Sequence, residues 1–212
     1  MYAKFLKRLF DFLLSLATLT VLSPLLLVLT ITGTAAMKGN PFFSQARPGR
    51  HEKIFRLIKF RSMTNEKGPD GKLLPDSQRL KPYGRFLRAS SLDELPELFN
   101  ILLGQMALVG PRPLLIQYLP YYTEEEKHRH DVRPGLTGLA QVNGRNLIGW
   151  DERLRYDTEY VKNITFAGDL RIVLKTVRKV FTHEDLAVDT DTAETYLDEE
   201  RRGALHDQSI RD

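Results

Sequence analysis

The amino-acid sequence predicts an α/β protein that is mostly helical and begins with a hydrophobic helical segment. Residues 10–37 are apolar apart from one aspartate and scattered hydroxyl residues, residues 40–63 alternate apolar and basic side chains, and the residues after Arg85 show helical spacing. A chain of 212 residues can bury one sizeable core but hardly two large ones. We therefore expect three parts: a membrane segment over 1–38, one cytosolic domain over 39–182, and a mobile tail over 183–212.

The N-terminal segment, FDFLLSLATLTVLSPLLLVLTITGTAAM, is interrupted near its centre by Ser23-Pro24. It is much longer than the apolar core of a signal peptide. An interior proline removes a backbone hydrogen bond and kinks a helix. Each half reaches only about 21 Å at 1.5 Å per residue, which is less than the roughly 30 Å of membrane hydrocarbon. These properties favour a helix that breaks inside the membrane.

Basic residues lie on both flanks of this segment: Lys4, Lys7 and Arg8 before it, and Lys38, Arg47 and Arg50 after it. Positive charge near a membrane helix favours the cytoplasmic side, so both ends are expected there. A re-entrant helix, which enters the membrane and returns to the same face, satisfies both the proline and the charges. A kinked spanning helix is the alternative, since prolines are tolerated in membrane helices when other donors serve the freed carbonyls.

The first elements of the body are expected to be two short strands, or one strand and an extended segment, within residues 40–63, around the turn at Arg47-Pro48-Gly49. A polar loop over 64–78 follows. A helix should then bury one face, because its apolar residues have helical spacing: Leu92, Leu95, Leu98, Phe99 and Leu102. Ser91 and Glu94 have the spacing of a capping box at the start of this helix.

A short helix over 117–130, a Gly-rich basic stretch and two further helices complete the body. In the last helix, apolar residues share one face and basic residues lie opposite: Leu170, Val173, Leu174 and Val177 against Arg171, Lys175, Arg178 and Lys179. Two explanations remain open for this pattern. The helix either packs its apolar face into the core or binds the surface of anionic lipid.

The net charge of +4 conceals a marked asymmetry. The tail from His183 holds ten acidic residues against three arginines, about −7, which leaves residues 1–182 at about +11. A basic body predicts an anionic partner, either a lipid surface or a phosphorylated substrate. No RNA-binding signature or zinc-finger spacing is present, so we expect no nucleic acid. The absence of cysteine excludes disulfides.

Several arginines and one lysine are framed by turn residues: Lys59, Arg61, Arg88, Arg112, Arg133 and Arg145. The planar guanidinium suits phosphate recognition, although any one such residue is more often a surface charge. Asp93 and Glu94 offer the oxygen ligands that Mg²⁺ prefers. Taken alone, this acidic pair is most simply explained as two residues in the first turn of a helix, where negative charge interacts favourably with the helix dipole. Together the acidic and basic groups predict a phosphate-handling site.

Four blocks carry a family resemblance: FSQARPG…KIFRLIKFRSM, SLDELPELFN, LVGPRPLL and RPGLTGLAQVNGRN. In this order behind a hydrophobic segment, they resemble the bacterial sugar transferase family, in particular its small monotopic polyprenyl-phosphate phosphoglycosyl transferases. The resemblance covers residues 1–182. It implies a re-entrant helix joined to a small cytosolic α/β domain with amphipathic interfacial helices, on the cytoplasmic face of the bacterial inner membrane.

The resemblance also implies a reaction. A UDP-sugar, expected to be N-acetylated and bacillosamine-like, gives its sugar 1-phosphate to undecaprenyl phosphate and releases UMP, as the first membrane step of glycoconjugate assembly such as protein glycosylation. The mechanism has two steps and passes through a covalent aspartyl-phosphosugar. The implied roles are Asp93 as nucleophile, Glu94 as Mg²⁺ ligand, Arg88, Arg112 and Arg145 near the diphosphate, Lys59 near the acidic pair, and Asp157 as a further polar or metal-linked residue.

A rival interpretation belongs to a different class. A non-catalytic, membrane-anchored scaffold would place its basic face on anionic lipid and recruit a partner through the acidic tail. It predicts no turnover and no special role for Asp93, so an activity assay separates it from the enzyme.

Overall fold

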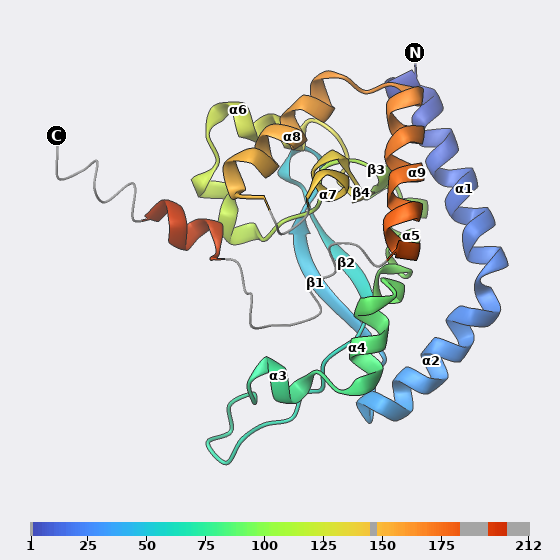
Figure 1. The fold of residues 1–212 in the computed structure, drawn as a ribbon, viewed down its shortest axis with the longest axis vertical. Coiled ribbons are helices and arrows are strands. Elements are labelled where there is room, and N and C mark those ends of the chain that lie inside the picture. Colours follow the sequence, from blue (N-terminus) through green and yellow to red (C-terminus); the bar gives the residue numbers. More distant parts are fainter. Residues whose placement is uncertain (1, 145–147, 183–194, 203–212) are drawn as a thin grey trace, which may run out of the picture.

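The computed structural model describes residues 2–144, 148–182 and 195–202. Helices α1 (Lys7–Val21) and α2 (Ser23–Met37) form a bent arm along one edge of the molecule, and the remaining elements form a body beside it (Figure 1). A π-helical turn, Tyr2–Leu6, precedes α1. The predicted class, α/β and mostly helical, is confirmed.

The two arm helices meet at a bend of 64°. Because Pro24 has no N–H, the carbonyl of Thr20 loses its usual backbone donor. The hydroxyl of Ser23 donates to that carbonyl instead, at 2.8 Å. The predicted break at Ser23-Pro24 is therefore confirmed. Among the described residues no single helix is long and apolar enough to cross a membrane. Of the described helices only this bent pair, taken together, is long and apolar enough, judged by length and composition alone.

One face of the arm packs on the body. In α1 the buried positions recur every four residues: Lys7, Asp11, Ser15 and Leu19. The carboxylate of Asp11 accepts the backbone N–H of Leu108 at 3.0 Å, which ties the arm to a buried strand. The opposite face exposes large apolar side chains, including Leu13, Leu16, Val21, Leu27, Val28 and Ile31. A helix pair whose first helix buries polar residues and whose outer face is apolar is unusual in water but suits lipid.

Two small sheets organise the body. Strands β1 (Phe42–Pro48) and β2 (Ile54–Phe60) form an antiparallel hairpin, as predicted. Strands β3 (Ala107–Val109) and β4 (Gly135–Thr137) pair in parallel. A Cβ on Gly135 would lie 2.1 Å from the backbone nitrogen of Gly110, so this close approach requires glycine.

Short helices cover the hairpin and connect the strands. In chain order they are α3 (Asp76–Arg79), α4 (Pro82–Ala89), the 3₁₀ turn η3 (Leu92–Glu94), α5 (Glu97–Leu102), η4 (Ile116–Tyr121), α6 (Glu124–Lys127), η5 (His128–His130), α7 (Leu139–Asn143), α8 (Trp150–Lys162) and α9 (Phe166–Thr182). A core of Leu19, Phe55, Leu57, Leu98, Ile101 and Met106 joins the arm, the hairpin and α5. The helix predicted over 117–130 is thus three short elements.

The predicted capping box is wrong. Ser91 lies in the left-handed region at φ 55°, and its side chain makes no capping hydrogen bond. Glu94 directs its carboxylate at two cations instead of the backbone. Pro96 has no N–H with which to continue η3, so a new helix, α5, begins after it. The apolar residues from 92 to 102 therefore belong to two short helical pieces rather than one.

The face of α9 that packs on the body is also not the one expected. Asp169 and Ile172 are buried, whereas Leu170, Leu174 and Val177 are 47%, 61% and 48% exposed. The last helix therefore presents most of its predicted apolar face outward, and only Val173 of that face packs against a core cluster. Of the two explanations for its pattern, burial in the core holds for Val173 alone.

Part of the tail is ordered against the body. Residues 197–202 are helical, and Leu197 is fully buried in a cluster with Leu114, Tyr118, Tyr122, Trp150 and Leu154. Arg201 forms ion pairs with Glu126 and Asp151 at 2.6 and 2.7 Å. Residues 195–202 of the expected mobile tail therefore dock on the body in this structure, because one leucine and one arginine find complementary partners. Residues 183–194 and 203–212 lie outside the described residues.

Candidate active site

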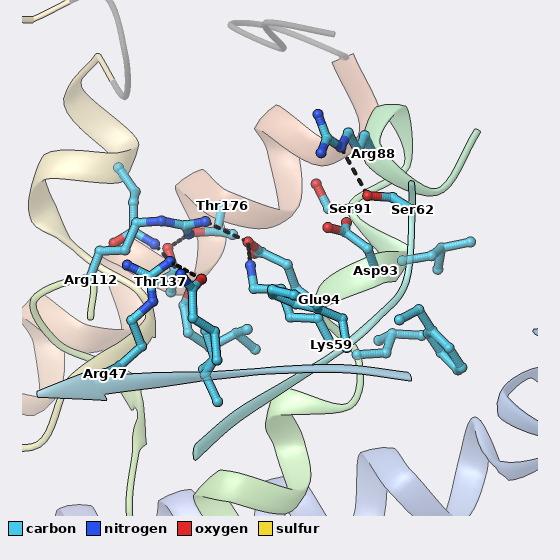
Figure 2. A pocket seen from close by; sticks show the side chains of 18 of the residues that line it. Arg47, Lys59, Ser62, Arg88, Ser91, Asp93, Glu94, Arg112, Thr137 and Thr176 are labelled. Atoms are coloured by element: carbon cyan, nitrogen blue, oxygen red, sulfur yellow. Dashed lines mark hydrogen bonds and ion pairs between the residues drawn. The ribbon is translucent and has the colours of Figure 1, made fainter. Parts of the chain in front are cut away.

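A pocket of about 870 Å³ opens where the hairpin, η3, the loop after β3 and α9 meet. Figure 2 shows its charged residues as sticks. The predicted site residues Lys59, Arg88, Asp93, Glu94 and Arg112 all line it. They come from four separate elements, so the tertiary fold assembles what the sequence distributes over more than fifty residues.

Glu94 is held tightly between two cations. Its Oε1 accepts from the Lys59 ammonium and from the Arg112 guanidinium, each at 2.7 Å. Burial alone would raise the pKa of Glu94, but the charges of Arg112 and Lys59 outweigh burial and hold it well below its usual range. Burial likewise opposes the charge on Lys59, and Glu94 reverses the effect, so the pKa of Lys59 is raised. Glu94 is therefore a fixed anion.

Asp93 differs from its neighbour. Within the described residues its carboxylate has no hydrogen bond or ion pair, and it projects into the pocket between Arg88 and Arg112 (Figure 2). Burial raises the pKa of Asp93, and the adjacent charge of Glu94 adds to this, against the opposing effects of Lys59, Arg112 and Arg88. A partly desolvated carboxylate that no donor occupies is available to react or to bind a ligand.

The backbone before the acidic pair directs Asp93 inward. Ser91, at φ 55° and ψ 18°, reverses the chain between α4 and η3. The N–H of Glu94 donates to the backbone carbonyl of Ser91 at 3.3 Å, so the tight turn is closed without a side chain. This turn lets consecutive carboxylates reach different partners.

Arg88 lies on one side of Asp93. Its Nε donates to the Ser62 hydroxyl at 3.1 Å, which fixes the direction of the guanidinium (Figure 2). Within the described residues no carboxylate lies within ion-pair distance of Arg88. Its remaining donors can therefore serve an anionic ligand.

Arg112 is supported from behind by a buried ion pair. Arg129 binds the carboxylate of Asp157 at 2.7 Å, and the same guanidinium nitrogen donates to the backbone carbonyl of Arg112 at 2.7 Å. Asp157 lines the pocket, but its carboxylate serves Arg129. In this structure Asp157 supports Arg112 through Arg129, and its predicted role as a further polar or metal-linked residue stays a prediction.

The predicted basic residues also include Arg133 and Arg145. Arg133 does not line the pocket and donates to the backbone carbonyl of Gly104 at 2.7 Å, near the end of α5. Arg145 lies outside the described residues. The predicted position of Arg145 near the diphosphate stays a prediction.

Sequence reasoning missed several pocket residues. Arg47, Arg79, Arg129 and Arg153 also line the cavity, and Glu97 lies 3.0 Å from the Lys59 ammonium. Burial, together with the charge of Glu94, raises the pKa of Glu97 to about 7. Arg47 could have been found, because side chains on a hairpin face recur at every second residue. Gln45 and Arg47 on β1 line the pocket together with Lys59 on β2.

Comparison with known proteins decides the family. The model of the family described as bacterial sugar transferase matches residues 2–183. The chain belongs to the bacterial sugar transferase family. The matched region contains every pocket residue named above and leaves out the docked helix at 197–202.

Individual relatives agree with this family. The chain is 50% identical to the "uncharacterized sugar transferase EpsL" of Bacillus subtilis, over 85% of this chain and 90% of the relative. It is 39% identical to the undecaprenyl-phosphate galactose phosphotransferase of Salmonella typhimurium, over 86% of this chain and 42% of the relative. Identity to the UDP-glucose:undecaprenyl-phosphate glucose-1-phosphate transferase of Klebsiella pneumoniae is 38%, over 84% of this chain and 40% of the relative. This bacterial sugar transferase thus spans about two fifths of the longer relatives.

Proposed function

We propose that this protein transfers a sugar 1-phosphate from a UDP-sugar to undecaprenyl phosphate and releases UMP. The observation that carries the proposal is the contrast between the two acidic neighbours. Asp93 is free in a cavity surrounded by cations, whereas Glu94 is bound by Lys59 and Arg112. The names of the longer relatives, which include undecaprenyl-phosphate sugar phosphotransferases, support the same substrates.

The proposed reaction has two steps. In the first, a carboxylate oxygen of Asp93 attacks the phosphorus bonded to the sugar, and the bond from that phosphorus to the oxygen of UMP breaks. UMP departs with this oxygen, and the sugar phosphate remains on Asp93. In the second, a phosphate oxygen of undecaprenyl phosphate attacks the same phosphorus, and the Asp93 carboxylate is restored. Splitting the reaction lets the soluble donor and the lipid use one site in turn.

The basic groups fit such chemistry, because phosphoryl transfer depends mainly on positioning and on neutralising charge. Arg88 and Arg112 lie on either side of Asp93 (Figure 2). The apolar outer face of the arm supports attachment to the membrane that carries the lipid acceptor. We place the arm as a re-entrant helix on the cytoplasmic face of the inner membrane, so that the pocket meets the acceptor phosphate at the surface.

We also propose Mg²⁺ as cofactor. Glu94 would be its ligand, since both cations bind Oε1, which leaves Oε2 without a partner among the described residues. The described residues hold no cluster of three or more metal-ligating side chains. This donor set fits Mg²⁺ better than most metals, because Mg²⁺ in phosphoryl-transfer sites takes one or two carboxylates and completes its shell with substrate oxygens and water. The ion would neutralise phosphate charge.

The identity of the sugar stays a prediction. The names of the relatives described above mention galactose and glucose, and not the N-acetylated, bacillosamine-like sugar that the family resemblance implied. A panel of UDP-sugars should therefore include glucose, galactose and N-acetylated sugars, each tested with undecaprenyl phosphate by following UMP release.

The test of the mechanism omits the lipid. With an active UDP-sugar alone, the enzyme should release UMP only up to its own amount. Intact mass spectrometry after a mildly acidic quench should then show one added sugar phosphate, on the peptide that holds Asp93. Asp93→Asn should show neither burst nor adduct while its thermal unfolding stays close to wild type. Turnover with lipid but no burst and no adduct would favour direct transfer, and no turnover with any donor would favour the scaffold.

A further inference from the structure

Arg47 is a pocket cation that the described residues satisfy only in part. It extends from the end of β1 and lies beside Arg112 (Figure 2). One terminal nitrogen donates to the Gln45 side chain at 2.8 Å, while its buried Nε has no hydrogen-bond partner. No carboxylate of the described residues lies within ion-pair distance of its guanidinium.

This arrangement is costly without an anion. A buried donor that has lost its bound water and gained no other acceptor carries the full cost of desolvation. Two like charges side by side also repel each other. Burial, and after it the charge of Arg112, lower the pKa of Arg47 to about 10, so the side chain still carries its charge at neutral pH. The carboxylate whose charge acts on Arg47 is Glu97, which already lies 3.0 Å from the Lys59 ammonium, and Glu94 is shared by Arg112 and Lys59. A further anion between Arg47 and Arg112 would relieve both costs.

The position of Arg47 and Arg112 relative to Asp93 indicates which anion they would bind. Arg88 and its partner Ser62 lie on one side of Asp93, and Arg112 and Arg47 lie on the other (Figure 2). A UDP-sugar has two linked phosphates, and attack by Asp93 on one of them expels the other. A nucleophile flanked by two cationic groups suits such a diphosphate, with one phosphate near each group.

The surroundings of the Arg47–Arg112 side suit a nucleoside. Thr137 and Thr176 lie beside Arg112, and they share a hydrogen bond at 2.6 Å (Figure 2). Gln141 lines the same pocket, and its buried Oε1 accepts no hydrogen bond from the described residues. Uracil presents an N–H donor that such an acceptor can bind. The polar groups needed to read a base therefore lie on this side of the cavity.

We propose that Arg47 and Arg112 together bind the phosphate that remains on the nucleotide, so that Arg47 is a further substrate-binding residue that stabilises the departing UMP. The proposal rests on the function proposed above. Its ligand chemistry is a phosphate monoester, which UMP and the lipid acceptor both contain. The test must therefore distinguish these two sources.

The experiment measures equilibrium binding to the full-length protein in detergent. UMP, uridine and a short-chain polyprenyl phosphate are each titrated against wild type, Arg47→Gln and Arg47→Lys. We expect Arg47→Gln to weaken UMP about 10- to 100-fold, the usual loss for a hydrogen bond to a charged group. Arg47→Lys should lie between, because it keeps the charge but not the planar fork. Uridine and the polyprenyl phosphate should change less than about twofold.

Arg56→Gln is the matched control, since Arg56 is an exposed residue of the same hairpin and does not line the pocket. It should bind all three ligands as wild type does. If Arg47→Gln instead weakens only the polyprenyl phosphate, the subsite belongs to the acceptor and the proposal is overturned. The proposal is also overturned if wild type and Arg47→Gln bind UMP equally well, or if Arg47→Gln weakens uridine as much as UMP. Binding requires no turnover, so a failure of the proposed reaction is recognised separately.

Discussion

Asp93 and Glu94 are adjacent in the chain, yet their carboxylates have opposite surroundings. Two cations bind Glu94 at 2.7 Å each, and no described group binds Asp93. A carboxylate bound by two cations is a poor nucleophile, because its charge is already neutralised, whereas a free one can attack. The difference arises from the turn at Ser91 and the short 3₁₀ element that follows it.

The first prediction concerns the metal at this residue pair. If Glu94 is a Mg²⁺ ligand, EDTA should abolish UMP release, and Mg²⁺ or Mn²⁺ should restore it better than Ca²⁺, whose coordination is longer and looser. Glu94→Gln should lose most activity even at high Mg²⁺. Glu97→Gln offers a nearby comparison, because Glu97 also lies beside Lys59 but is not a proposed ligand. Full activity in chelator would remove the metal from the mechanism.

At the scale of elements, the bend between α1 and α2 determines how the arm can lie in a membrane. Pro24 breaks the backbone ladder, and Ser23 supplies the missing donor to Thr20. Four threonine hydroxyls of the arm also donate to carbonyls four residues earlier: Thr20, Thr30, Thr32 and Thr34. These hydroxyls are therefore satisfied within their own helices, as a lipid environment requires.

The second prediction tests topology with single cysteines, which the natural chain lacks. Cysteines at Ala3 and Ser44 should both be protected from an impermeant maleimide applied to intact spheroplasts, because a re-entrant arm keeps both flanks in the cytoplasm. Replacing Ser23 and Pro24 by leucine should straighten the arm and expose a fraction of Ala3→Cys to the reagent. Labelling of either cysteine while Ser23 and Pro24 are retained would contradict the re-entrant arrangement.

The short C-terminal helix is the second element whose role the structure makes explicit. Leu197 is fully buried, and the Trp150 indole N–H donates to the carbonyl of Thr195 at 2.9 Å. The guanidinium carbon of Arg153 lies over the same indole ring, 4.4 Å from its centroid. Arg153 lines the pocket, so the tail supports a wall of the site through one tryptophan.

The third prediction follows from this packing. Leu197→Ala should destabilise the protein by about 2–5 kcal/mol, the usual range for emptying a buried leucine site. Tyr196→Ala is the control, because Tyr196 is 52% exposed and should change stability little. Thermal unfolding in detergent measures both. An unchanged unfolding midpoint for Leu197→Ala would mean that the tail helix is not docked in solution.

At the scale of the whole molecule, one aspartate joins the membrane arm to the body. Asp169, at the start of α9, accepts from Tyr2 and Lys7 of the arm at 2.6 and 2.7 Å and from Tyr160 of α8 at 2.8 Å. The Lys7–Asp169 pair is almost fully buried, with 11% and 7% of the side chains exposed. This network determines where the arm sits relative to the pocket.

The fourth prediction uses the asymmetry of buried ion pairs. Asp169→Ala should cost about 3–5 kcal/mol, because the buried Lys7 ammonium loses its partner at 2.7 Å and keeps only Asp11, at 3.8 Å. Adding Lys7→Met to that variant should recover part of the loss, since a buried charge is then replaced by an apolar side chain. Unfolding midpoints of the two single variants and the double variant measure the coupling. Additive losses would show that the pair does not hold the arm.

Local signals in the sequence determined much of this protein. The hairpin follows from alternation, the helices α8 and α9 from periodicity, and the bend of the arm from Ser23-Pro24, because each depends on residues close together in the chain. The same holds for the choice of Lys59, Arg88, Asp93, Glu94 and Arg112, which share one pocket. The family also followed, because four short motifs in a fixed order are specific.

Only the tertiary structure decided which partners each of these residues has. The basic flanks of the arm illustrate this, since Lys7 pairs with Asp169, Arg8 donates to the carbonyl of Leu102, and Arg47 lines the pocket. Ser91 fits a capping motif yet adopts a left-handed turn, and most of the predicted core face of α9 points outward. In each case a contact with a distant segment outweighs a local preference worth about 1 kcal/mol. Which carboxylate is free and which cation lacks a partner depends on such distant contacts, and no local pattern contains them.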